Sequence, residues 1–298
     1  MKILHIFCLI SFVFLGANGQ FPCPVAEEIA PCTCSTDDDF RISMDCSKVK
    51  SDEELSKAFS HTFPFNDIRQ LLIKNKPSEA RVPIEVINES TFSDKTFDEV
   101  IISHTNLHKV TLQAFAYSNT TMESLKLSDN LLSEFPFEVV SYLHKLKKLY
   151  LHNNNLQIMS DLTSESLEEI QLSYNRQLYF DVNAFKHVPN LRNILLQDTS
   201  LAHISPRLFS EQTSLEILDL SHNRLTALET DAILTKSTSL KEVKLNDNIL
   251  KSAEIDKEFI KGESFVCFTI YNYITYYNLL LIYRFWFITS YPNFSEYK

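Results

Sequence analysis

The sequence predicts an α/β solenoid, a curved stack of short repeated units with parallel strands on one face. Eight segments share the spacing apolar-x-x-apolar-x-apolar, and their starts lie 21 to 29 residues apart. In five of them an Asn follows three residues after the third apolar position. Four cysteines cluster just ahead of the repeats, between Cys23 and Cys46, as a disulfide-bonded end cap would require. No such unit can bury its apolar side alone, so the stacking of units must supply the core.

The composition excludes several classes of enzyme. The chain has 298 residues but three glycines, Gly16, Gly19 and Gly262, which is too few for a P-loop, a dinucleotide-binding turn or a GxSxG nucleophile elbow. The net charge of −10 argues against binding to a phosphate backbone, so we expect no nucleic-acid partner. No grouping of Ser, Cys, His, Asp or Glu has the spacing of a catalytic or metal site. We therefore expect no enzyme activity, no cofactor and no metal.

Residues 1–19 have the pattern of a signal peptide. A short positive start at residues 1–2 precedes an apolar run with one His at residues 3–15. This run is too short to span a bilayer, and small residues at Ala17 and Gly19 suit cleavage after Gly19. A buried N-terminal helix is the alternative. The pattern predicts a secreted, extracellular protein that starts at Gln20.

Residues 20–67 are expected to form a cysteine-rich cap. In a secreted chain, Cys23, Cys32, Cys34 and Cys46 indicate two disulfides, and a Cys32–Cys34 pair is disfavoured because its loop would be strained. The spacing alone leaves the pairing open. A zinc site is the alternative, but the segment has no His and no common zinc spacing. Ser51 with Glu54 forms a capping-box pattern that predicts a short helix through Phe59.

Residues 68–262 contain the eight repeats. The segments begin at Ile68, Phe97, Met122, Leu146, Leu167, Leu191, Leu215 and Leu240. This is the leucine-rich-repeat pattern LxxLxLxxNxL at its usual period. Each Asn can satisfy buried backbone groups where a strand turns, so these side chains should form an asparagine ladder. Its members are Asn130, Asn154, Asn175, Asn223 and Asn248, with Thr105 and Thr199 in the same position of two other repeats. Apolar residues in the second halves of the repeats suggest short helices or irregular turns on the convex side.

The cap segment CPVAEEIAPCTC, the later Cys46 and the repeats behind it resemble a known family. This is an arthropod group of secreted leucine-rich-repeat proteins described as non-catalytic subunits of oplophorus-luciferin 2-monooxygenase. The resemblance covers residues 20–262. It implies a secreted, glycosylated, non-enzymatic protein that can partner an enzyme, with Cys23 paired to Cys34 and Cys32 paired to Cys46. It does not imply luminescence, because the luciferase activity belongs to the other subunit.

Residues 263–298 depart from this pattern. They contain one cysteine, Cys267, instead of a second cysteine cap, and we expect no further repeat in them. Residues 264–283 carry no charge and are long enough for a membrane anchor, although five Tyr and two Asn weaken that interpretation. The alternatives are a buried cap, or a truncation or translated non-coding sequence, since the tail is rich in residues with AT-rich codons.

The exposed strand positions of the repeats predict a binding surface on the concave face. Tyr150, His152 and Tyr174 fall together on adjacent repeats, and Tyr-rich clusters are common hot spots of protein interfaces. Three His on this face would make binding sensitive to pH. The candidate partner-binding residues are His104, Lys126, Tyr150, His152, Tyr174 and His222. The sequons at Asn88 and Asn119 predict glycans on the convex side or edge.

These features predict an extracellular, non-catalytic protein-binding subunit whose concave face holds another secreted protein, such as an enzyme subunit. One alternative is a free soluble protein that recognises microbial or matrix ligands. The other is a receptor ectodomain, which would contact the membrane only if residues 264–283 are a genuine anchor.

Overall fold

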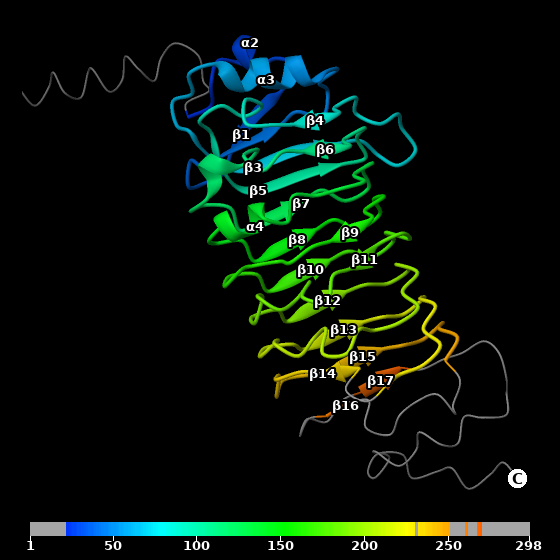
Figure 1. Cartoon of the computed structure of the whole chain (residues 1–298). Helices are drawn as coiled ribbons and strands as arrows, with labels where there is room; N and C mark the ends of the chain where they lie inside the picture. Colours follow the sequence, from blue (N-terminus) through cyan, green and yellow to red (C-terminus); the bar gives the residue numbers. More distant parts are fainter. Residues whose placement is uncertain (1–21, 230–231, 251–259, 262–266, 270–298) are drawn as a thin grey trace, which may run out of the picture.

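The computed structural model describes residues 22–229, 232–250, 260–261 and 267–269. The expected signal peptide lies outside these residues, and so does the candidate membrane segment apart from residues 267–269. In the described part, no helix is both long and apolar enough to cross a membrane. The fold is the expected leucine-rich-repeat solenoid, a single stack of turns that runs the length of the molecule (Figure 1).

One sheet of eleven strands runs through the whole stack. Its first two strands pair antiparallel, and every later pair is parallel, because each turn of the solenoid brings the chain back in the same direction. The strands in spatial order are β1 (Thr33–Thr36), β2 (Ile42–Asp45), β3 (Asp67–Lys74), β5 (Thr96–Ser103), β7 (Ser124–Lys126), β8 (Lys148–Tyr150), β10 (Glu169–Gln171), β12 (Asn193–Leu195), β13 (Ile217–Asp219), β15 (Glu242–Lys244) and β17 (Cys267–Thr269).

The convex side carries the short helices and irregular turns that the sequence predicts. Its regular elements are the 3₁₀ helix η1 (Ala116–Ser118) and the four-residue helix α4 (Val139–Tyr142), and turns make up most of the rest. Three pairs of two-residue strands lie outside the large sheet; the pairs β4/β6 and β9/β11 follow one flank, and β14/β16 lies near the last turns (Figure 1). These pairs are β4 (Val86–Ile87) with β6 (Lys109–Val110), β9 (Ile158–Met159) with β11 (Tyr179–Phe180), and β14 (Ile233–Leu234) with β16 (Ile260–Lys261).

The core is a continuous apolar column between the sheet and the convex side. The central strand position of each of the eight repeats is fully buried. Phe92 and Phe115 come from the second halves of repeats and fill the outer layer, and the Phe92 ring centroid lies 5.1 Å from that of Phe97 on β5 and 5.8 Å from that of Phe115. The buried central residues are Leu71, Val100, Leu125, Leu149, Ile170, Ile194, Leu218 and Val243.

The asparagine side chains join consecutive turns of the solenoid. The Asn175 amide group donates to the carbonyls of Leu172 in its own repeat (2.7 Å) and Leu151 in the repeat before it (3.1 Å). Its carbonyl oxygen accepts the N–H of Leu156 at 3.0 Å. The other four ladder asparagines make equivalent bonds. Each side chain therefore satisfies buried backbone groups in two repeats at once.

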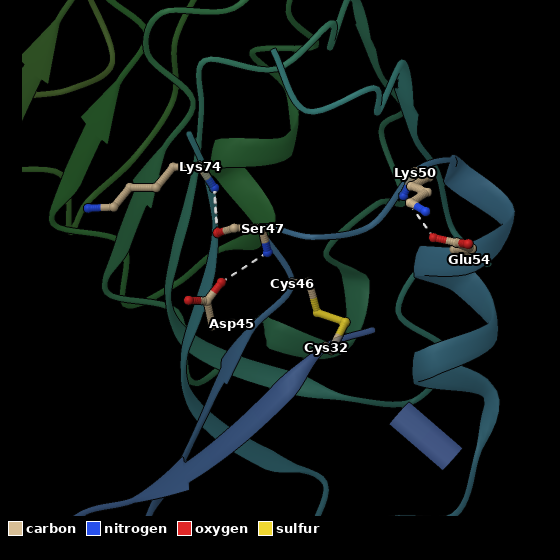
Figure 2. Close-up of a disulfide and its surroundings, with 7 residues drawn as sticks. All are labelled: Cys32, Asp45, Cys46, Ser47, Lys50, Glu54 and Lys74. Carbon is tan, nitrogen blue, oxygen red and sulfur yellow. Dashed lines mark hydrogen bonds between the residues drawn. A yellow bond between two sulfur atoms is a disulfide. The ribbon is translucent and has the colours of Figure 1, made fainter. Parts of the chain in front are cut away.

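The N-terminal cap closes the apolar end of the stack. Its disulfides are Cys23–Cys34 and Cys32–Cys46, the pairing that the family resemblance implies. The short helix α2 (Ala26–Ile29) lies between the first two cysteines. The predicted capping-box helix is α3 (Asp52–Ser60), where the Ser51 side chain accepts the N–H of Glu54 at 3.2 Å. Figure 2 shows the Glu54 carboxylate reaching back to the N–H of Lys50, at 2.8 Å.

The sheet continues beyond the end that the sequence analysis assigned to the repeats. Strand β17 pairs with β15, with Phe268 opposite Val243. Residues 265, 268 and 270 are Phe, Phe and Ile, so the apolar spacing of the repeats recurs there, one repeat period after Leu240. The sequence analysis did not recognise this ninth segment, because the tail is rich in aromatic residues.

Candidate functional site

The concave face presents a central row of side chains, one from each repeat. The register of the strands places each of these residues directly beside its counterparts in the adjacent repeats. The row is Leu72, Ile101, Lys126, Tyr150, Gln171, Leu195, Asp219 and Lys244. Two residues earlier on each strand is an outer row of Gln70, Glu99, Ser124, Lys148, Glu169, Asn193, Ile217 and Glu242.

Glu99 connects three strands of this face. Its carboxylate accepts from the Gln70 amide group at 2.6 Å and from the Lys126 ammonium group at 2.6 Å. Burial raises the pKa of the Glu99 carboxyl, but the hydrogen bonds from Lys126 and Gln70 outweigh it and leave the pKa below its ordinary value. Glu99 is therefore a charged acceptor that holds Lys126 in one position.

Tyr150 continues this connection across the next two strands. Its ring centroid lies 5.6 Å from the Lys126 nitrogen, and its hydroxyl donates to the Glu169 carboxylate at 2.9 Å. Burial is the largest cause that raises the pKa of the Tyr150 phenol to about 12, and the hydrogen bond to Glu169 is the next. The hydroxyl therefore stays protonated and remains a donor. We call Gln70, Glu99, Lys126, Tyr150 and Glu169 the polar strip; it crosses β3, β5, β7, β8 and β10.

His152 adjoins the polar strip. Its ring centroid lies 6.5 Å from that of Tyr150, and its Nδ1 lies 2.8 Å from the Ser128 hydroxyl. Burial lowers the pKa of His152, and the nearby Asp129 carboxylate opposes this shift only in part. The ring therefore stays neutral further into the acid range than a free histidine. Any pH-sensitive binding through His152 should begin at a lower pH than the sequence suggests.

Because its pKa is lowered by folding, His152 should make the protein less stable in acid. The unfolded chain binds the proton more readily than the folded chain does. The contribution of His152 to the free energy of unfolding is therefore fully present above about pH 6.5 and is lost as the pH falls below that value. We expect the urea midpoint of the parent to fall more than that of His152→Gln between about pH 7.5 and pH 5. Equal falls in the two proteins would contradict this assignment.

The turns after the strands form a further row of side chains. Seven non-glycine residues there adopt left-handed backbone conformations, with φ between 50° and 61°. Each of the first six donates its backbone N–H to a carbonyl in the turn of the following repeat, which continues the ladder of the sheet. The row is His104, Asp129, Asn153, Tyr174, Asp198, His222 and Asp247. Tyr174 is unusual among them, because a bulky aromatic residue rarely adopts this conformation; its side chain is 46% exposed.

The structure brings together three of the six candidate binding residues. Lys126, Tyr150 and His152 are in contact through the distances given above. Tyr174 lies at the end of the next strand, while His104 and His222 belong to repeats further away. The His104 Nε2 lies 3.0 Å from the Glu79 carbonyl oxygen, and the His222 Nε2 lies 3.4 Å from the Asp247 carboxylate.

Two carboxylates of the polar strip, Glu99 and Glu169, were not among the candidates. They occupy the outer row, and the repeat register would have placed them beside Lys126 and Tyr150.

Asp219 is a residue of the central row that the structure does not leave open to solvent. It is fully buried, although its row lies on the solvent-facing side of the sheet. It accepts hydrogen bonds from Gln197 and from both the N–H and the hydroxyl of Ser221, and Lys244 lies 3.4 Å away. Among the described residues, no group of three or more His, Cys, Asp or Glu side chains could hold a metal ion.

Both predicted glycan sites lie away from the concave face. Asn88 directly follows β4 on the flank, and its side-chain oxygen accepts the N–H of Ser90 at 2.9 Å. Asn119 directly follows η1 and is exposed.

A family model described as "Leucine rich repeat" matches residues 96–156 and 165–225. The chain therefore carries leucine-rich repeats by sequence as well as by fold. It is 37% identical over 217 residues to the oplophorus-luciferin 2-monooxygenase non-catalytic subunit of Oplophorus gracilirostris, an alignment that covers 72% of this chain and 59% of that protein. It is 28% identical to the transforming growth factor beta activator LRRC33 of Danio rerio, over 83% of this chain and 36% of that protein. Human lumican is 33% identical over 49% of this chain and 42% of its own length.

The chain therefore spans less than two thirds of the length of each of these relatives. One relative of this leucine-rich-repeat protein is named as a non-catalytic subunit, and none of the three is named as an enzyme on its own.

Proposed function

We propose that this leucine-rich-repeat protein is a secreted, non-catalytic binding subunit whose concave face holds another secreted protein. The polar strip with His152 and Tyr174 is its contact surface. The observation that carries the proposal is the connected path from Glu99 through Lys126 and Tyr150 to Glu169. These contacts fix an aromatic ring and a cation before a partner arrives, which lowers the entropy cost of binding.

The comparisons and the cap support this proposal. The relative from Oplophorus gracilirostris is named a non-catalytic subunit, which suits a chain that acts through a surface. Two disulfides in the cap suit an oxidising, extracellular compartment. We extend the proposal to the organisation of the chain: a signal peptide over residues 1–19, the cap, the repeats, and glycans at Asn88 and Asn119, which leave the concave face open.

Affinity capture tests the proposal. The full-length chain, tagged and secreted from cultured cells, is incubated with extracellular fluid of the source organism, and we expect one secreted protein at near-equal stoichiometry. Recovery of the chain alone, or with only microbial or matrix material, would favour free recognition and contradict the subunit proposal. Retention of the full-length chain in the membrane fraction would instead favour the receptor ectodomain.

Variants of the polar strip should weaken this complex. Tyr150→Ala removes the central ring and Lys126→Glu reverses the charge beside it, so we expect the Kd for the recovered protein to rise about 30-fold in each case. The matched controls are Tyr142→Ala, an exposed ring on α4, and Lys57→Glu, an exposed lysine on α3. They should leave the Kd unchanged. Equal effects of all four variants would contradict a concave binding site.

A further inference from the structure

The short strands β9 and β11 lie side by side on the flank of the solenoid (Figure 1), and they carry an exposed apolar patch. Ile158 and Tyr179 occupy paired positions on these strands and are 61% and 64% exposed. Val182, two residues after β11, is 62% exposed. We call Ile158, Tyr179 and Val182 the flank patch. Such contiguous apolar exposure is unusual on a soluble protein and marks interaction surfaces.

The fold does not require these apolar residues to face outward. The next positions on the same strands, Met159 and Phe180, are buried and supply the core contacts. In the corresponding pair β4 and β6, the buried positions are Ile87 and Val110, and the outward position of β6 is the exposed Lys109. A charged residue is therefore tolerated at such a site, so the packing of the solenoid does not explain Tyr179.

The charges around the flank patch indicate the chemistry of its partner. Asp181 directly follows β11, and its side chain accepts the N–H of Asn183 at 2.9 Å. Within the described part of the chain it makes no ion pair. Asp161 stands two residues after β9, with its carboxylate 3.0 Å from His187 Nδ1. A symmetric contact between two copies of the chain would place the same two carboxylates of each copy in one interface, which is unfavourable.

We propose that the flank patch docks a second, folded protein that presents apolar side chains to Ile158 and Tyr179 and a Lys or Arg to Asp181. This goes beyond the concave-face function, because it uses a different surface and does not depend on the polar strip. The ion pair would select the partner and set its orientation, while burial of the apolar pair would supply most of the affinity.

Site-specific crosslinking tests the proposal. The full chain is prepared with p-benzoylphenylalanine in place of Tyr179, and separately in place of Tyr142, an exposed tyrosine of α4, across the sheet from β9 and β11 (Figure 1). Each is irradiated in extracellular fluid of the source organism, and adducts are mapped by mass spectrometry. We expect position 179 to give an adduct with one protein other than this chain, within reach of a Lys or Arg, and position 142 to give none with it.

Competition adds the second measurement. Excess parent chain should remove the adduct, and about 30-fold more of the double variant Ile158→Ser, Asp181→Lys should be needed for the same effect. Both positions are exposed, so the variant should keep the thermal midpoint of the parent, which circular dichroism checks. The proposal is overturned by the absence of an adduct at 179, by equal adducts at 142, by an adduct with a second copy, or by equal competition.

Discussion

The Asn154→Ala variant should lose about 3 kcal/mol of unfolding free energy. The Asn154 amide group donates to the carbonyls of Leu127 and Leu151, both at 2.9 Å, and its oxygen accepts the N–H of Leu132 at 3.1 Å. The side chain is 6% exposed, so water cannot replace these bonds without the stack opening. Each buried group left without a partner costs about 1 to 3 kcal/mol. The Leu127 carbonyl also accepts a hydrogen bond from Asn130, so we take the lower end of this range for the Leu127 carbonyl.

Urea unfolding followed by circular dichroism measures this loss, with Asn155→Ala as the matched control. Asn155 is the next residue in the same turn, and its side chain is exposed, so its replacement should change the unfolding free energy by less than about 0.5 kcal/mol. Asn154→Thr should fall between the two, because Thr occupies this position at residues 105 and 199. If the Asn154→Ala and Asn155→Ala variants unfold alike, the ladder does not stabilise the stack in this way.

The ladder also shows why the repeats could be predicted from the sequence while parts of the surface could not. The inward positions recur with a fixed spacing, and stacking requires the same chemistry in each turn, so their pattern is visible in one chain. The rows of the concave face follow from the same register. Whether a residue in these rows stays exposed depends on its neighbours in other repeats. Asp219 is buried because Gln197 from the repeat before it and Lys244 from the repeat after it lie against it.

Dependence on neighbours in other repeats also explains why the polar strip was predicted only in part. Lys126 and Tyr150 were candidates because of their residue types, whereas nothing in the sequence distinguishes Glu169 from Glu168 beside it. Glu168 directly precedes β10 and its carboxylate lies 3.5 Å from the Arg192 side chain, whereas the carboxylate of Glu169, the first residue of β10, accepts a hydrogen bond from Tyr150. The end of the repeats was misplaced for a different reason. Aromatic residues at positions 265 and 268 keep the apolar spacing, but a search for Leu and Asn does not find them.

Removal of the Cys32–Cys46 disulfide should destabilise the protein more than removal of Cys23–Cys34. Cys32 lies just before β1 and Cys46 just after β2, so this bond closes the open end of the hairpin (Figure 2). It closes a loop of 14 residues, which in the chain-entropy model contributes about 3 kcal/mol. Both of its cysteines are buried, so their loss also removes packing at the end of the core. The other bond closes 11 residues, and its Cys34 is partly exposed.

We therefore expect Cys32→Ala, Cys46→Ala to lose about 4 kcal/mol and Cys23→Ala, Cys34→Ala about 3 kcal/mol. The N–H of Cys46 donates to the Leu72 carbonyl at 2.8 Å, so opening the hairpin also loosens the first repeat. Hydrogen exchange should then show lost protection in β2 and β3 for the first pair and little change beyond β5, because contacts in a solenoid reach only neighbouring repeats. The reverse order of stability would contradict this ranking of the two disulfides. Lost protection throughout the sheet would show that the cap stabilises the stack as a whole and not only its first turns.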